Sequence, residues 1–357
     1  MAVPVSDRKQ PADRAETKLP EHAFEAILLV SFGGPEGPDD VMPFLENVTR
    51  GRNVPPERLL EVAHHYELFD GVSPINEQNR ALIAALEPEL RARGIDLPVY
   101  FGNRNWGPYL TDTMQQMRVD GVRRALAVFT SAFSSYSGCR QYREDLFNAQ
   151  QAVGPDAPEV PRVRMFFNHP GFVQANVDRV RDALARVPAG AHLAFTAHSI
   201  PAVMAKNCAY EAQLAETARL VAEAVGVTDW ALAYQSRSGP PQVPWLEPDI
   251  GDHLESVAKR GVAAVVVAPI GFVSDHLEVL FDLDVEAKEI AERLGLAFAR
   301  AGTAGTHPAF VGGLADMIAE RLTPGAGREA VGRLAPSHDV CAPDCCLSGS
   351  GRPSPWD

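Results

Sequence analysis

The sequence has 357 residues, of which 46% are apolar and 22% charged, so the chain can bury a sizeable core and its length predicts about two domains. A net charge of -13 argues against nucleic acid or an anionic membrane as the main partner, because either would be repelled by this surface. Five cysteines and no basic-then-apolar leader are typical of a cytoplasmic protein rather than a secreted disulfide framework. The longest apolar stretch, at 261–273, is too short for a transmembrane segment.

The predicted elements alternate between short apolar runs and longer amphipathic stretches. Residues 1–23 are polar and punctuated by proline, so we expect them to be disordered. Strands are then predicted at 26–32, 98–102, 125–130 and 163–167, and amphipathic segments such as 76–93 separate them. A second series of strands is predicted at 192–197, 230–236, 263–270 and 296–302. Apolar runs that alternate with helices are typical of parallel sheets built from βαβ units.

The fold class is therefore predicted to be α/β, with two similar lobes that each contain a parallel sheet flanked by helices. We expect the N-terminal lobe to span 24–168 and the C-terminal lobe 169–322. A proline-broken tail with clustered cysteines follows at 323–357.

Ligands of such folds bind beyond the carboxyl ends of the strands, so the segments after the predicted strands are the candidate sites. SFGGPEGPDD, at 31–40, follows the first strand, but it lacks both the GxGxxG spacing and the lysine of a nucleotide-binding loop. A glycine turn before a capped helix explains this segment about as well as contact with a ligand does.

His198 and a row of carboxylates follow two later strands. A lone histidine such as His198 is more often structural than functional. The row occupies positions i, i+3, i+7 and i+11, which form one stripe of a helix, and its members are Asp275, Glu278, Asp282 and Glu286. Like charges at this spacing destabilise the helix slightly, so the row is either a solvated face or a place that handles hard cations and protons.

Six segments, in order over about residues 25–322, resemble the ferrochelatases. They are SFGGPEGP, GVSPIN, GNRNWGPY, TAHSIP, QSRSGPPQVPWLEPD and PIGFVSDHLEVLFDLD. The resemblance implies a lyase of haem biosynthesis that inserts ferrous iron into a porphyrin. ENVTRGR, YFGNRNW and the cysteine tail resemble the actinobacterial branch, whose substrate is coproporphyrin III and whose product is Fe-coproporphyrin (coprohaem).

The resemblance also implies roles for the residues singled out above. His198 and Glu278 would face each other across the porphyrin plane as the catalytic pair, and which of them deprotonates the ring stays open. Neutral imidazole suits this work because it titrates near neutrality and binds Fe²⁺. Asp282 and Glu286 would form a path for metal or protons that leads from Glu278. Asp275 and His276 would position the helix.

A porphyrin cleft needs apolar walls and a few cationic anchors. By position in the matched segments, the candidate porphyrin-binding residues are Phe32, Ser73, Ile75, Arg50, Arg104, Trp106 and Trp245. Some bacterial relatives carry a tyrosine where this chain has Phe32, so metal coordination by a side-chain oxygen is excluded at this position.

Three of the five cysteines lie in CAPDCC, at 341–346. This spacing offers three of the four thiolates that a tetrahedral zinc or a [2Fe-2S] cluster requires, whereas a vicinal disulfide is disfavoured in a reducing cytoplasm. Some ferrochelatases carry a cluster bound by tail cysteines and one internal cysteine. That resemblance predicts a [2Fe-2S] cofactor held by Cys139, Cys341, Cys345 and Cys346, with Cys208 as the alternative to Cys139.

Several alternatives stay open from sequence. They are a protoporphyrin IX ferrochelatase, a chelatase for another ring or metal such as cobalt and sirohydrochlorin, and a non-catalytic haem carrier or sensor with a redox cluster. A carrier needs no base, so His198 together with the acidic row argues against the last. The expected partners are the porphyrin and Fe²⁺, with no nucleic acid, and with transient contacts to neighbouring haem-pathway enzymes.

Overall fold

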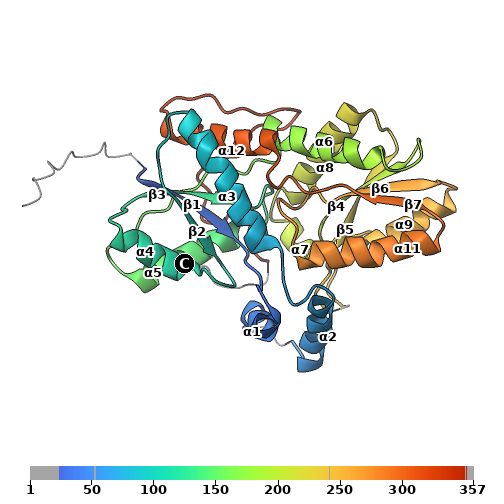
Figure 1. Cartoon of the computed structure of the whole chain (residues 1–357), viewed down its shortest axis with the longest axis horizontal. Coiled ribbons are helices and arrows are strands. Elements are labelled where there is room, and N and C mark those ends of the chain that lie inside the picture. The colour runs from blue at the N-terminus through green and yellow to red at the C-terminus, as the bar shows by residue number, and fades with distance from the viewer. Residues whose placement is uncertain (1–23, 52–53, 241, 350, 352–357) are drawn as a thin grey trace, which may run out of the picture.

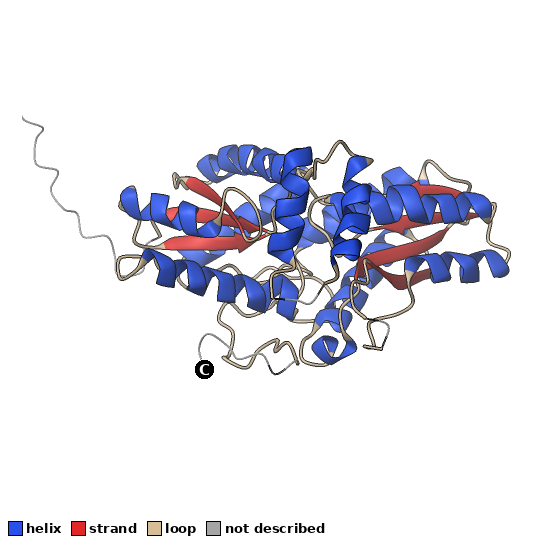
Figure 2. Cartoon of the chain, turned by 90° about the horizontal axis from the view of Figure 1, so that it is seen from below, coloured by secondary structure: helices blue, strands red, loops and turns tan. Residues whose placement is uncertain are grey.

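The computed structural model describes residues 24–51, 54–240, 242–349 and 351. The segment predicted to be disordered, 1–23, lies outside the described residues. Two parallel sheets lie side by side, each between layers of helices (Figures 1 and 2). The predicted fold class, α/β with parallel sheets flanked by helices, is confirmed. None of the described helices is long and apolar enough to cross a membrane.

The first sheet has the strand order β2-β1-β3. Its strands are β1 (Ala26–Ser31), β2 (Val99–Asn103) and β3 (Ala125–Phe129). The associated helices are α1 (Pro38–Val48), α2 (Pro56–Glu67), α3 (Ile75–Ala92), α4 (Leu110–Val119), the π-helix η1 (Tyr136–Arg140) and α5 (Gln141–Val153). All residues of β1 and β3 are buried, as expected for strands covered on both faces.

The second sheet has the strand order β5-β4-β6-β7. Its strands are β4 (His192–His198), β5 (Trp230–Gln235), β6 (Ala264–Ala268) and β7 (Ala297–Arg300). The helices are α6 (Pro170–Leu184), α7 (Ala202–Ala205), α8 (Tyr210–Val225), α9 (Ile250–Lys259), α10 (Leu277–Val279), the π-helix η2 (Leu280–Ala287), α11 (Lys288–Arg293) and α12 (Pro308–Leu322).

The strand predicted at 163–167 is wrong. This part of the chain forms only isolated bridges, from Glu159 to Arg124 and from Arg162 to Ala127, and then leaves the edge of the sheet. Its aromatic residues are buried among helices instead, with the Phe166 ring centroid 5.6 Å from that of Phe310 in α12. An apolar run predicts burial, but it does not distinguish a strand from an irregular buried segment.

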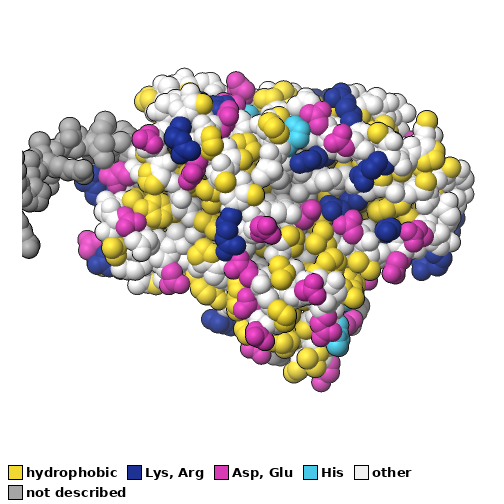
Figure 3. Space-filling model, viewed as in Figure 1, with side chains coloured by type: hydrophobic (Ala, Val, Ile, Leu, Met, Phe, Trp, Pro, Cys, Tyr) yellow, Lys and Arg dark blue, Asp and Glu magenta, His cyan; other side chains and the backbone are white. Residues whose placement is uncertain are grey.

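Helix α12 joins the two halves of the molecule. It packs against α6 of the second half and α3 of the first, where Arg93 donates to the Asp316 carboxylate at 2.9 Å. The predicted domain boundaries at 168 and 322 stay predictions. Helices α1 and α2 project from the body of the molecule, and acidic side chains gather on this projection (Figures 1 and 3).

Candidate active site and tail cysteine site

His198 is the last residue of β4, at the carboxyl end of a buried strand. Its Nδ1 lies 2.5 Å from the carbonyl oxygen of Ser199. A carbonyl only accepts hydrogen bonds, so Nδ1 carries the proton and the neutral ring keeps its lone pair on Nε2. The Tyr210 hydroxyl donates to the His198 carbonyl at 3.0 Å, which fixes the backbone. The strand therefore presents a basic nitrogen at its end.

Glu278 faces that nitrogen from α10. Its Oε2 lies 3.6 Å from His198 Nε2 and 4.0 Å from His276 Nδ1. The side chains of His198 and Glu278 are 34% and 52% exposed, so both are open to a ligand. Burial lowers the pKa of His276, which favours its neutral form. An imidazole lone pair and a carboxylate at this distance can share a proton or a cation.

The loop before α10 is held by close packing against β4 and by an ion pair with Arg300 at the end of β7. Gly271 donates its amide to the Thr196 carbonyl at 3.0 Å, and a Cβ on this glycine would lie 2.5 Å from the Ala197 Cβ. Any larger residue would push the loop away from the strand. The Asp275 carboxylate binds the Arg300 guanidinium at 3.0 Å. The expectation that Asp275 shares a helical stripe with the other carboxylates is wrong, because Asp275 precedes the helix and points to Arg300.

Of the remaining carboxylates, Asp282 and Glu286 lie on the π-helix η2, and Glu278 lies on α10 directly before it. A π-helix has i→i+5 hydrogen bonds and more residues per turn than an α-helix, so residues four apart fall closer to one line. Burial raises the pKa of Asp282 to about 7, and the charges of Glu278 and Glu286 add to the effect. Hydrogen bonds from Ser236 and from Gln235, the latter at 3.3 Å, oppose it. Asp282 can thus gain or lose a proton near neutrality.

Helices α1 and α2 pack against α10 and η2. Leu277 packs in a cluster with Phe44 and Tyr66, and the His65 ring stacks on Phe281 with centroids 3.7 Å apart. Burial and the nearby charge of Glu278 raise the pKa of Tyr66. Sequence reasoning missed these α2 residues because no spacing links them to the acidic row.

Five of the predicted porphyrin-binding residues are uncharged, and they differ in burial and in their contacts. Ser73 and Ile75 are buried against the loop after β1, where a Cβ on Gly34 would lie 2.6 Å from that of Ser73. Phe32 is 37% exposed. Trp106 donates to Asp40 at 3.3 Å. Trp245 bridges to Pro201, three residues after His198.

The two predicted cationic anchors differ. Arg50 is exposed at the end of α1. Arg104 is buried, with its Nε 2.5 Å from the Asp145 carboxylate and its guanidinium 4.5 Å from the centroid of Tyr142. The charge of Arg104 is therefore already neutralised in this structure.

The tail brings its cysteines to Cys139 in η1. Cys139 and Cys346 are buried, and the sulfurs of Cys345 and Cys346 lie 3.5 Å apart. Hydrogen bonds with Cys139 and Cys345, together with the Arg162 guanidinium, lower the pKa of the Cys341 thiol. Four thiols from two distant segments therefore lie together, and the buried Arg162 cation beside Cys341 favours the thiolate form of that cysteine.

Two arginines fix the tail. Arg162 donates to Cys341 Sγ at 2.9 Å, and Arg140 donates to the carbonyls of Pro343 and Cys345 at 2.5 and 2.9 Å. Sequence reasoning missed both arginines.

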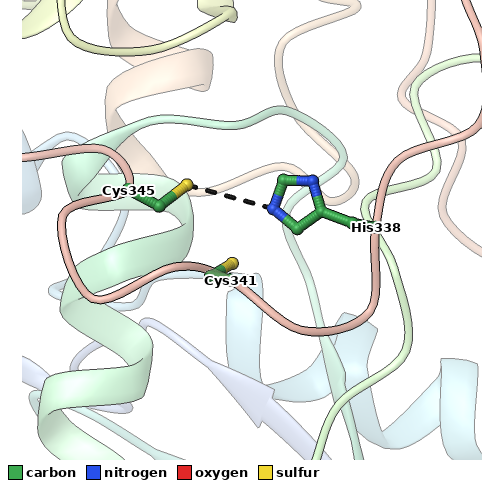
Figure 4. Close-up of side chains that lie close together, drawn as sticks. All are labelled: His338, Cys341 and Cys345. Carbon is green, nitrogen blue, oxygen red and sulfur yellow. Dashed lines mark hydrogen bonds between the residues drawn. The ribbon is translucent and has the colours of Figure 1, made fainter.

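Cys208 lines the same cavity as Cys345 and Cys346, but its thiol is engaged elsewhere. Its thiol donates to the Met204 carbonyl at 3.3 Å, and burial raises its pKa to about 11. Sequence reasoning also missed His338, whose Nε2 lies 3.9 Å from Cys345 Sγ (Figure 4).

The chain is similar to known proteins over most of its length. Residues 24–322 match the family model described as ferrochelatase. A protein named ferrochelatase from Rhodopirellula baltica is 58% identical, covering 92% of this chain and 95% of its own length. A protein named coproporphyrin III ferrochelatase from Streptomyces coelicolor is 54% identical, covering 93% of this chain and 95% of its own.

The fold is also similar to that of a solved structure, SirB from Bacillus subtilis with Fe³⁺. The TM-score is 0.54 at 12% identity, over 84% of this chain and 96% of that one, so the likeness concerns the fold alone. The sequence matches go further, because they cover almost the whole chain at more than half identity. The chain therefore belongs to the ferrochelatase family, the lyases that insert ferrous iron into a porphyrin in haem biosynthesis.

Proposed function

We propose that this ferrochelatase acts on coproporphyrin III, with His198 and Glu278 as its catalytic pair. The assignment of the catalytic pair rests on the 3.6 Å separation of His198 Nε2 and Glu278 Oε2, with the imidazole lone pair on Nε2. The substrate assignment is supported by relatives such as the Streptomyces coelicolor protein, which is named coproporphyrin III ferrochelatase.

The reaction exchanges two pyrrole protons for one Fe²⁺. We propose that His198 Nε2 accepts a pyrrole proton, because it is the unprotonated ring nitrogen and it is exposed enough to meet the macrocycle. Glu278, whose Oε2 lies 3.6 Å from that nitrogen, stabilises the imidazolium that forms, and its carboxylate accepts the second pyrrole proton in the complementary acid/base role. Each group therefore stabilises the charged form of the other.

Asp282 and Glu286 extend this site along η2. With a pKa of about 7, Asp282 can pass a proton onward near neutral pH. A row of carboxylates whose charges repel one another is also stabilised by a divalent cation, since the cation removes the repulsion. We therefore propose that the row carries the metal in and protons out, with Glu278 at its inner end.

The porphyrin walls are proposed from the same segments. Phe32 and Trp106 supply aromatic surface, Trp245 lies beside the segment after His198, and Ser73 and Ile75 shape the loop under them. Arg50 is the exposed cation of the two predicted anchors, so we propose it ahead of Arg104 as a propionate partner. Arg104 would first have to leave Asp145.

The tail cysteines fit a [2Fe-2S] cluster, and we propose Cys139, Cys341, Cys345 and Cys346 as its ligands. The donor set is four cysteine thiols, the most common ligand set of a [2Fe-2S] cluster, and Arg162 offsets negative charge beside it. Cys208 is set aside because its thiol is engaged with a helix carbonyl. When bound, the cluster supplies a redox-active centre. The residues of the chain position the thiolates and tie the tail to η1 through Arg140.

A substrate competition tests the substrate assignment. Purified protein and Fe²⁺ are given coproporphyrin III and protoporphyrin IX together under anaerobic conditions, and both metalated products are quantified. We expect coproporphyrin III to be metalated faster. Faster metalation of protoporphyrin IX would refute the assignment, and binding of either porphyrin without consumption of iron would favour a carrier instead.

A further inference from the structure

The tail site contains a fifth donor atom that an all-thiolate cluster does not use. A ring nitrogen of His338 and the sulfurs of Cys341 and Cys345 all lie within 4.8 Å of one another. All three side chains come from the tail and point toward a common space (Figure 4). His338 is exposed, so no packing requirement explains why its ring lies beside two thiols.

The distances suit a single four-coordinate metal. Zinc binds sulfur at about 2.3 Å and nitrogen at about 2.0 Å, so tetrahedral geometry separates its ligand atoms by roughly 3.5–3.8 Å. The His338 Nε2 to Cys345 Sγ distance is 3.9 Å, and the Cys345 to Cys346 sulfur distance is 3.5 Å. His338, Cys341 and Cys345 already lie within 4.8 Å of one another, and Cys346, which is outside that group but 3.5 Å from Cys345, would have to rotate to become the fourth ligand.

The local chain also suits such a site. His338, Cys341 and Cys345 are separated by two and three residues, within the short spacings that zinc-binding chelate pairs use. Arg162 donates to the His338 carbonyl at 3.4 Å and to Cys341 Sγ at 2.9 Å, so one buried side chain holds both ends of the first pair. A cavity of about 400 Å³ is lined by His338, Cys345 and Cys346, and it gives an ion access to the donors.

We propose that the tail forms a mononuclear site for a borderline divalent cation such as Zn²⁺, with His338, Cys341, Cys345 and Cys346 as ligands. Imidazole and thiolate together form a common donor set for zinc. This site would share three thiols with the proposed cluster and leave Cys139 out. The two metal states would therefore exclude each other, and metal supply would decide which one the tail adopts.

The test uses Co²⁺ as a spectroscopic probe of the full-length protein, freed of metal by chelation under anaerobic conditions. We expect one equivalent to bind with the charge-transfer and d–d bands of a tetrahedral thiolate site. His338→Ala should weaken Co²⁺ binding at least about 10-fold, because even residues that only orient a ligand cost that much. His338→Cys should restore tight binding, with d–d bands shifted to lower energy by the additional thiolate.

Two further variants give the test its contrast. Cys139→Ser should bind Co²⁺ like the unmodified chain although it loses the cluster, and His64→Ala, an exposed histidine on α2, should change neither. An unchanged Co²⁺ affinity and spectrum in His338→Ala would overturn the proposal, as would loss of the Co²⁺ site in Cys139→Ser. Loss of the cluster colour in His338→Ala would show that His338 contributes to the cluster, contrary to the proposal. Iron insertion is measured separately, so these outcomes do not depend on the chelatase assignment.

Discussion

The catalytic pair and the tail cysteine site both join distant parts of the chain, but they are held by different forces. His198 ends a buried strand, and the loop that leads to Glu278 on α10 is fixed by the Gly271 contact and the Asp275–Arg300 ion pair. The tail has no strand or helix from 323 to 349, and the guanidinium groups of Arg140 and Arg162 hold it. Packing therefore preorganises the first site, whereas the second depends on charged hydrogen bonds and on its metal.

The largest effect should come from His198→Ala, which removes the proposed base from a rigid setting. Iron insertion should be abolished while the far-ultraviolet circular dichroism and the melting temperature stay close to those of the unmodified protein. The fold should persist because the side chain is one-third exposed and contributes little packing. Near-normal turnover by this variant would show that the pair is not the catalytic centre.

Glu278→Gln tests the charge rather than the shape of the same site. The amide keeps size and hydrogen bonding but loses the proton acceptor, so kcat should fall at least about 100-fold while porphyrin binding persists. Steady-state kinetics and a fluorescence titration of the porphyrin would separate the two effects. A fall of less than tenfold would assign Glu278 a structural role.

Substitutions of cysteine ligands should change the metal content of the tail and its attachment to the rest of the protein. Purified protein should be reddish-brown with roughly two irons per chain, the content of a [2Fe-2S] cluster. Cys139→Ser should bleach it and make the tail more susceptible to proteolysis, because ligand loss removes binding energy that holds the segment. Cys208→Ser is the matched control and should stay coloured. The reverse pattern would make Cys208 the ligand. A protein that stays colourless after anaerobic reconstitution with iron and sulfide would exclude the cluster.

The smallest expected effect is that of Asp282→Asn, which should act mainly at low Fe²⁺ concentration. An increase in the KM for iron with kcat within about tenfold of normal is expected, since Glu278 keeps its charge. A loss as large as that of Glu278→Gln would mean that the carboxylates act as one unit.

The same variant has a predictable pH dependence of stability. The folded-state pKa of about 7 is above the usual carboxyl value, so the folded state binds more protons than the unfolded state between about pH 4 and pH 7. Stability contributed by this group is present below pH 4 and is lost as the pH rises to 7. Asp282→Asn should therefore raise the melting temperature by at least about 2 °C at pH 8 and by less at pH 5. An equal rise of the melting temperature at pH 8 and at pH 5 would contradict the raised pKa of Asp282.

Local pattern predicted the strands well where burial and periodicity coincide. β1 and β6 are runs of apolar residues buried throughout, and both lie where the sequence predicts them. The same reasoning was wrong at 163–167, because the Phe166 ring packs against Phe172 of α6 and Phe310 of α12 rather than within a sheet. It also predicted an α-helix where η2 forms, because spacing alone does not reveal a π-helix.

The sequence by itself determined the α/β class, the family and the identities of the residues that carry charge and thiols, because these follow from composition, periodicity and short motifs. Only the tertiary structure decided that Asp275 pairs with Arg300, that Tyr66 lies beside Glu278, and that Arg162 and His338 border the cysteines. Such contacts join segments that are distant in the chain or depend on how a loop docks. The geometry of these contacts is set by how the elements pack against one another. The order of residues within a single element does not reveal that packing.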